Sequence, residues 1–234
     1  MTDAPEPPPV SRRTTLRLQA MPAEQVPREP ATRRLLFGAI LALLAALAWV
    51  LTRPPPRADD ALSWSDIVPP AATPIHPWRW IVIHHSASRR SSSQDIDREH
   101  QLVRGWDGIG YHFVIGNGTD MPLGRIDVTY RWRTQTHGAH AGPAPEQAPY
   151  NQDGIGICLI GNLEADSFNP YQERRLVELC ALLIHNVPTL SVSRIIGHRD
   201  VPGKATACPG ANVDLERLRF LVREELTTRH FTVR

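Results

Sequence analysis

An uncharged run of seventeen residues, 35–51, decides where this 234-residue chain can build a globular core. As a helix the run would be roughly 25 Å long, at the short end of what crosses a bilayer. Arg33 and Arg34 directly precede it, which favours an N-terminus in the cytoplasm. We expect an uncleaved transmembrane anchor. A cleaved signal peptide, with residues 46–48 as its Ala-Leu-Ala cleavage site, and a buried core helix are the alternatives.

The segments on either side of this run are also unsuited to a core. Residues 1–34 contain seven prolines and no aromatic residue, which predicts a disordered cytoplasmic segment. Residues 52–77 are rich in proline and predict a stiff, extended linker. Its apolar side chains are candidates for docking on the domain: Leu62, Trp64, Ile67 and Val68. The folded domain is therefore expected over residues 78–228, exported to the cell envelope and outside the cytoplasm.

Composition narrows the class of protein further. The chain is 41% apolar and 21% charged, which fits one globular domain with extensions. A net charge of +2, from scattered basic residues, gives no reason to expect a nucleic-acid partner. Three cysteines at irregular spacing do not form a disulfide framework. Cys158 and Cys180 are expected in the core, which leaves Cys208 in a loop, and the domain is expected to be monomeric.

Strand and helix patterns alternate through the domain. Strands are predicted over residues 78–85, 108–116, 121–126, 154–161 and 194–197, with a hairpin turn at Asn117-Gly118. Helices are predicted over 93–104, with Ser93 as N-cap, from Asn169-Pro170 to about Asn186, and over 213–227. This order favours a single α/β domain with a central, mixed sheet flanked by helices.

One loop brings together two side chains that bind metals. His198 and Cys208 lie ten residues apart, with Pro and Gly between and after them. Imidazole and thiolate are good zinc ligands, and a catalytic zinc site keeps three protein ligands and one open position. The apolar segment 81–83 delivers the pair His84-His85 at a strand end, which offers the third ligand. The pattern predicts a hydrolytic zinc site; a surface histidine with an unrelated buried cysteine is the alternative.

Five motifs in a fixed order carry a family resemblance. They are His84 at a strand end, Gly-Tyr-His-Phe-Val-Ile at 110–115, Gly-Ala-His at 138–140, Ile-Gly-Ile-Cys-Leu-Ile-Gly at 155–161, and the segment from Gly197-His198 to Cys208-Pro209-Gly210. Together they resemble the zinc-dependent N-acetylmuramoyl-L-alanine amidases, a superfamily that includes the phage lysozyme-type amidases and the peptidoglycan recognition proteins. The resemblance covers about residues 78–225.

The resemblance implies the roles of individual residues. It implies a Zn²⁺ ion held by His84, His198 and Cys208, and a catalytic Tyr111 that points at the attacking water or the substrate oxygen. It also implies that His140 lines the substrate groove. Thr206 stands where some bacterial members carry a lysine, with Lys204 two residues further back, and both are candidate catalytic residues. Cys158 stands where some members carry a glutamate, so no carboxylate base is identified.

Strand geometry separates neighbouring histidines. Successive side chains in a strand face opposite sides, so His84 and His85 cannot both face one metal. By the same alternation, Tyr111 and Phe113 should share a face and His112 should take the other. His85 and His112 are therefore expected to be structural.

The implied reaction is zinc-dependent hydrolysis of the amide bond between N-acetylmuramic acid and L-alanine in peptidoglycan. The alternative is a non-catalytic peptidoglycan-binding module of the same fold, which loss of a zinc ligand would have favoured. An unrelated zinc peptidase is disfavoured, because the chain has no His-Glu-x-x-His motif. The expected partners are peptidoglycan and, through the N-terminal helix, the membrane.

Overall fold

The structure is a computed structural model that describes residues 61–231, together with Ile40 and Val233. The expected cytoplasmic segment 1–34, the rest of the anchor and residues 52–60 lie outside the described residues. Within the described part of the chain, no helix combines the length and the apolar character needed to cross a membrane.

Five strands form the central sheet, in the order β3-β2-β4-β1-β5. Strand β1 pairs in parallel with β4 and β5, and β2 pairs in parallel with β4, whereas β3 is antiparallel to β2. The strands are β1 (Trp80–His85), β2 (Phe113–Ile115), β3 (Ile126–Val128), β4 (Gly154–Leu159) and β5 (Ile195–Gly197). The sheet is therefore mixed and lies between helices, so the predicted α/β class is confirmed.

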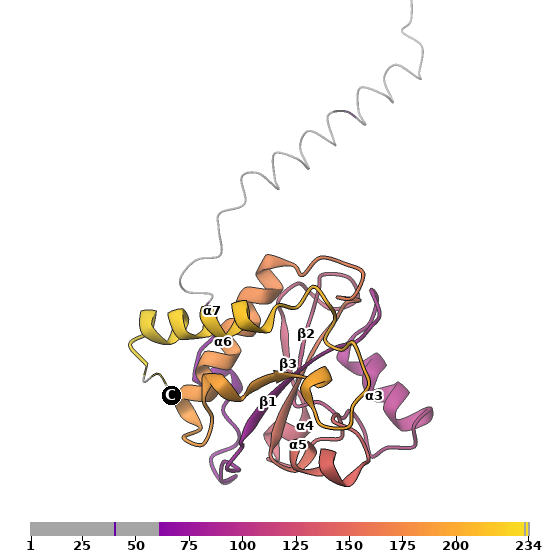
Figure 1. Ribbon diagram of the computed structural model, residues 1–234, viewed down its shortest axis with the longest axis horizontal. Coiled ribbons are helices and arrows are strands. Elements are labelled where there is room, and N and C mark those ends of the chain that lie inside the picture. Colours follow the sequence, from indigo (N-terminus) through magenta and orange to yellow (C-terminus); the bar gives the residue numbers. More distant parts are fainter. Residues whose placement is uncertain (1–39, 41–60, 232, 234) are drawn as a thin grey trace, which may run out of the picture. The chain divides into compact units, whose positions relative to one another are not determined.

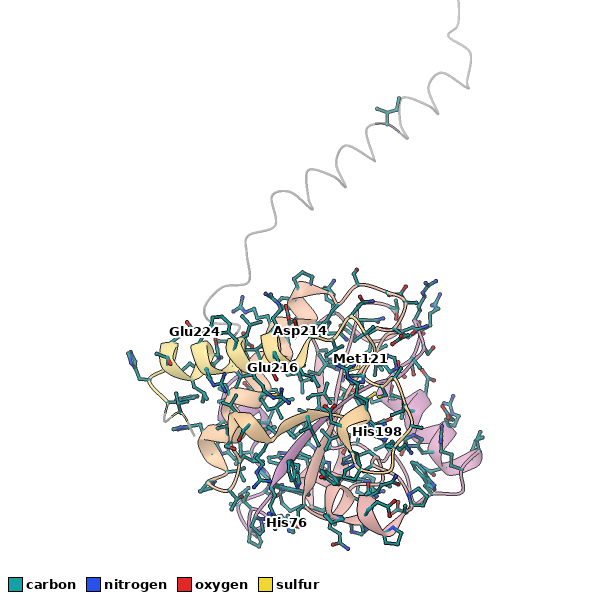
Figure 2. All side chains as sticks on the ribbon, viewed as in Figure 1. His76, Met121, His198, Asp214, Glu216 and Glu224 are labelled. Carbon is teal, nitrogen blue, oxygen red and sulfur yellow. The ribbon has the colours of Figure 1, made fainter. Side chains whose placement is uncertain are left out.

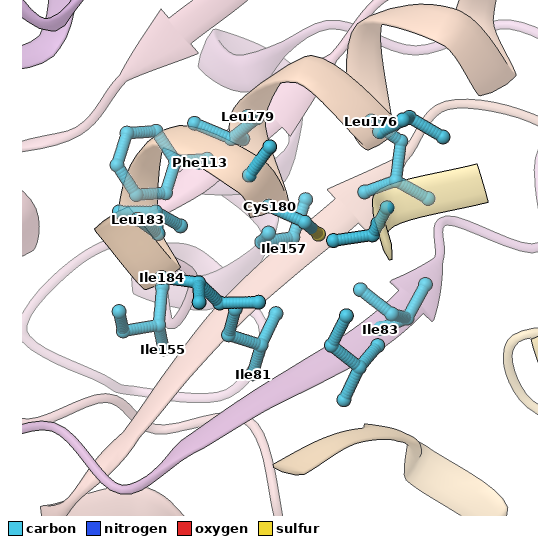
Figure 3. Close-up of a cluster of buried hydrophobic side chains, with 14 of the residues drawn as sticks. Ile81, Ile83, Phe113, Ile155, Ile157, Leu176, Leu179, Cys180, Leu183 and Ile184 are labelled. Atoms are coloured by element: carbon cyan, nitrogen blue, oxygen red, sulfur yellow. The ribbon is translucent and has the colours of Figure 1, made fainter. Parts of the chain in front are cut away.

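Helices α6 (Pro170–Asn186) and α7 (Leu215–Thr228) cover one face of the sheet (Figure 1). Alternate residues of β1 and β4 pack against them, because successive strand residues face opposite sides. Figure 3 shows the resulting layer of apolar side chains, with Ile81, Ile83, Ile155 and Ile157 from the strands facing Leu176, Leu179, Cys180, Leu183 and Ile184 of α6. This layer is the main core, and it leaves the opposite face of the sheet for other residues.

Helix α3 (Ser93–Leu102) covers part of that opposite face (Figure 1). Its Ile96 packs with Val114 of β2 and Cys158 of β4. Ser92, rather than the predicted Ser93, caps the helix, because its side chain accepts a hydrogen bond from the Asp95 amide. His84 points to this same face.

Helix α6 follows its sequence signals closely. Asn169 caps α6 through hydrogen bonds from the Tyr171 and Gln172 amides, Pro170 takes the first position, and the helix ends at Asn186 as predicted. Helix α7 begins at Leu215, two residues later than predicted, because Asp214 serves as its cap.

The predicted strand over 108–116 is much shorter in the structure, and the tight hairpin turn is absent. Strand β2 begins at Phe113, and residues 116–125 form a long connection to β3. Strand alternation therefore does not extend back to Tyr111. Phe113 packs in the main core with α6, whereas Tyr111 packs on the opposite face, so the prediction that they share a face is wrong.

Residues 61–68, including the short helix α2 (Trp64–Ile67), pack against the domain. Leu62 and Ile67 are buried, while Val68 is 45% exposed. The Leu62 amide donates to Glu178, and Trp132 Nε1 donates to the Ile67 carbonyl at 2.5 Å. The remaining short elements are α4 (Tyr130–Arg133), α5 (Ala148–Gln152) and three 3-10 turns, η2 (Pro145–Gln147), η3 (Val192–Arg194) and η4 (His198–Asp200).

Candidate functional site

His84 is the fifth residue of β1 and is almost fully buried, with 1% of its surface exposed. Its Nδ1 lies 3.7 Å from the Cys208 sulfur, and its Nε2 lies 3.1 Å from Nδ1 of His140. His85 turns away, as predicted, and its Nδ1 accepts a hydrogen bond from the Leu163 amide at 3.1 Å. The two neighbouring histidines thus have separate surroundings.

The loop after β5 supplies the other two residues. His198 opens the turn η4 directly after the strand (labelled in Figure 2). Arg199 closes the loop: its amide donates to the Cys208 carbonyl at 2.8 Å, and its guanidinium donates to the carbonyls of Gly210 and Val213. These bonds hold the backbone that carries Cys208 beside the end of β1, where the His85 amide donates to the Cys208 sulfur at 3.4 Å.

The potential ligand atoms of His84, His198 and Cys208 all lie within 4.8 Å of one another. In a tetrahedral zinc site, typical bond lengths place a sulfur and a nitrogen ligand about 3.6 Å apart. The 3.7 Å between Cys208 Sγ and His84 Nδ1 matches that spacing without any movement of the backbone. Two imidazoles and one thiolate also suit zinc chemically, so these residues fit the metal.

Burial controls the protonation of these groups. It lowers the pKa of His84 well below its usual value, with a further lowering from the neighbouring His140, and burial also lowers the pKa of His198. Both rings are then neutral near pH 7, the form that binds metals. Burial raises the pKa of the Cys208 thiol to about 11, partly offset by the His85 amide. Metal binding must therefore displace a proton from this thiol.

Tyr111 stands beside the candidate ligand His84, with a distance of 5.1 Å between the two ring centroids. Its backbone is held on both sides: Thr129 Oγ1 donates to the Tyr111 carbonyl at 2.7 Å, and the Gly110 amide donates to His100 Nδ1 at 3.0 Å. Burial raises the pKa of the Tyr111 phenol well above its usual value. The phenol is therefore protonated at neutral pH, and it lies within hydrogen-bonding reach of the Cys158 thiol.

A cleft with a volume of about 710 Å³ opens next to the ligand cluster. It is lined by His100, Arg104, Trp106, Tyr111, His137, Gly138, Ala139, His140, Gly142, Pro143, Ala144, Ala148, Asn151, Gln152, His198 and Lys204. Lys204 thus borders the cleft beside His198. Thr206 is not in this lining, and its hydroxyl oxygen accepts a hydrogen bond from the Cys208 amide at 3.2 Å.

His140 borders the cleft but is 94% buried, since only 6% of its surface is exposed. Both of its ring nitrogens already have protein partners, His84 Nε2 and the Gly154 carbonyl. His112 is fully buried, and its ring joins the Gly156 amide to the Thr136 carbonyl. One of the two bonds of His140 therefore leads to the candidate metal ligand His84, and the other leads to the backbone of β4.

His100 is a buried residue that lies outside the five sequence motifs. It is 5% exposed, with its ring centroid 4.6 Å from that of Trp106. It accepts the Gly110 hydrogen bond that holds the Tyr111 backbone. A signal was present, because helical spacing places His100 on the same face as the buried Ile96.

Comparison with known proteins agrees with this geometry. Residues 74–211 match the family model described as N-acetylmuramoyl-L-alanine amidase. The chain is 30% identical over 142 residues to peptidoglycan-recognition protein SC2 of Drosophila melanogaster, covering 57% of this chain and 69% of that protein. It is 29% identical over 155 residues to the endolysin of Enterobacteria phage T3, covering 63% of this chain and 88% of the endolysin.

A solved structure is similar as well. N-acetylmuramoyl-L-alanine amidase LysC from Clostridium intestinale URNW superposes with a TM-score of 0.51 at 30% identity, covering 65% of this chain and 91% of that chain. The family match spans more than half of the chain and includes Tyr111 and all three candidate ligands. The chain therefore belongs to the N-acetylmuramoyl-L-alanine amidase family.

Proposed function

We propose that this protein hydrolyses the amide bond between N-acetylmuramic acid and L-alanine in peptidoglycan, and that the reaction depends on zinc. The observation that carries the proposal is the convergence of His84, His198 and Cys208 within 4.8 Å beside the cleft. A binding module without activity has no need of a complete ligand set. Membership of the amidase family supports the same reaction.

The residues around the cluster have distinct roles in the proposed reaction. When bound, zinc supplies Lewis acidity toward the substrate carbonyl and acidifies water. His84, His198 and Cys208 hold the metal at the end of the cleft. The protonated phenol of Tyr111 donates a hydrogen bond to the oxygen on which negative charge develops. Thr206 supplies a second hydroxyl donor, and Lys204 binds a carboxylate of the peptide stem.

Cys158 does not serve as the general base. Its side chain is fully buried in β4, and burial raises the pKa of its thiol well above the usual value. It remains a neutral thiol, unlike the glutamate that some family members carry there. This residue instead provides a matched control for the metal site.

Separate alanine variants of Cys208 and Cys158 test the proposal. Cys208→Ala should abolish zinc binding and turnover, because it removes a ligand. Cys158→Ala also removes a buried thiol, but it should retain one zinc per chain. The zinc content and the peptidoglycan turnover of both purified variants are the measurements. Full zinc occupancy in Cys208→Ala would rule out this ligand set.

We propose further that residues 35–51 anchor the protein in a membrane, with the domain outside the cytoplasm. The uncharged run and the arginines before it support this orientation. Protease added to intact spheroplasts should digest the domain and spare the N-terminal segment. A mature protein that starts near Trp49 would show cleavage instead.

A further inference from the structure

One loop, residues 138–142, contacts both histidines of the candidate metal site from the side away from Cys208. We propose that this loop, held by Asn151, fixes the orientation and the tautomer of His84 and His198, so that His140 and Asn151 are positioning residues for the metal. This inference rests on the proposed zinc site. It assigns His140 a role different from direct substrate binding.

The hydrogen bonds of His140 determine the tautomer of His84. The Gly154 carbonyl can only accept, so His140 Nε2, 3.1 Å away, must carry a hydrogen. A neutral imidazole carries a single hydrogen, so with that hydrogen on Nε2 the Nδ1 of His140 is a bare acceptor. His84 must then donate from Nε2, at 3.1 Å, which leaves its Nδ1 lone pair facing Cys208.

The ring of His140 occupies a space that two glycines keep open. A Cβ atom on Gly156 would lie 2.4 Å from His140 Cδ2, and one on Gly138 would lie 2.3 Å from the same atom. Any larger residue at either position would displace the ring. The imidazole is therefore held in one orientation by packing as well as by its two hydrogen bonds.

The next residue of the loop acts on the second histidine. The carbonyl of Ala141 lies 3.3 Å from His198 Nε2 and can only accept, so that nitrogen is the donor. The remaining nitrogen of His198, Nδ1, is left to bind metal. Both imidazoles thus use Nε2 for the loop and keep Nδ1 for the metal.

The side chain of Asn151, in α5, holds this loop through three hydrogen bonds. Its Oδ1 accepts from the amides of His140 and Ala141, both at 2.8 Å, and its Nδ2 donates to the Gly142 carbonyl at 2.8 Å. Hydrogen-bonding partners behind metal-binding histidines orient the rings and raise their basicity. Asn151 therefore influences both ligands without contacting either one.

This arrangement can be tested by measuring the zinc affinity of the full-length protein in competition with a chromogenic chelator. His140→Leu and Asn151→Leu should each weaken zinc binding by about 10–100-fold, the usual effect of losing such a partner. Gln172→Leu is the matched control, because Gln172 is a buried amide that donates to the Ile115 and Ile160 carbonyls, away from the site. It should lower stability in urea but leave zinc affinity unchanged.

Conservative variants separate positioning from simple loss of folding. His140→Asn places an oxygen near the position of Nδ1 and should recover most of the affinity lost in His140→Leu. Asn151→Asp keeps both acceptor bonds, so its affinity should lie between those of wild type and Asn151→Leu. If the leucine variants do not fold, reduced affinity in Asn151→Asp and a changed visible spectrum of its cobalt form would support the proposal.

Two results would overturn the inference in distinguishable ways. Folded variants of His140 and Asn151 that bind zinc as tightly as wild type would show that the loop does not position the ligands, and the proposed function would stand. A wild-type protein that binds no zinc would refute the proposed function itself.

Discussion

Cys208 is subject to two opposing effects on its suitability as the proposed metal ligand. Burial raises the pKa of its thiol to about 11, although a zinc ligand must be a thiolate. The His85 amide, which donates to the sulfur at 3.4 Å, offsets part of that cost. His85 thus supports the site through its backbone, while its ring binds elsewhere.

Thr206 and Lys204 should affect different kinetic constants. Under the proposed function, Thr206→Val removes a donor to the developing oxyanion, so kcat should fall by about 10²-fold. Lys204→Ala removes a charge that borders the cleft, so KM should rise while kcat changes little. Steady-state kinetics at measured zinc content would distinguish them, with Thr206→Ser as the variant that keeps the hydroxyl. A collapse of kcat in Lys204→Ala alone would reverse the two roles.

The sequence predicts well those helices and strands that short stretches of neighbouring residues define. Asn169 and Pro170 start α6 through hydrogen bonds within one turn, and β1 follows from its run of apolar residues. The start of β2 depends instead on its pairing with β3 and β4, which a local pattern does not show, so the face predicted for Tyr111 is wrong. The bonds of His140 and Asn151 also join an irregular loop to β1, β4 and α5, which no periodic pattern reveals.

Residues 61–68 make a testable contribution to the stability of the domain. Ile67 is 2% exposed and packs in the main core, so Ile67→Ala should lower the free energy of unfolding by about 2–5 kcal/mol. The neighbouring Val68 is 45% exposed, and Val68→Ala should change the free energy of unfolding by less than about 0.5 kcal/mol. Urea unfolding of both variants gives the comparison. Equal, small effects would mean that this segment is not part of the folded core.

For the molecule as a whole, buried histidines predict a marked dependence of stability on pH. Burial is the main cause that lowers the pKa values of His84, His112 and His140, the last to about 3. The unfolded chain, with an ordinary histidine pKa near 6.5, binds more protons below that pH. The stabilisation is complete above about pH 6.5 and is lost as the pH falls toward the folded pKa values.

Urea unfolding of the metal-free protein between pH 7 and pH 4 measures this effect. Each fully buried histidine should contribute a slope of about 1 kcal/mol per pH unit, and His140→Asn should reduce the total slope by that amount. A free energy of unfolding that stays constant between pH 7 and pH 5 would contradict neutral burial of these rings.

The most direct test of the whole account is the product released from peptidoglycan. The purified protein would be incubated with sacculi, with and without a zinc chelator, and the soluble products identified by mass spectrometry. We expect free stem peptides that begin with L-alanine, intact glycan strands, and no release in the presence of chelator until zinc is restored. Binding to sacculi without release of peptides, or release that chelation does not affect, would contradict the assignment of a zinc-dependent amidase.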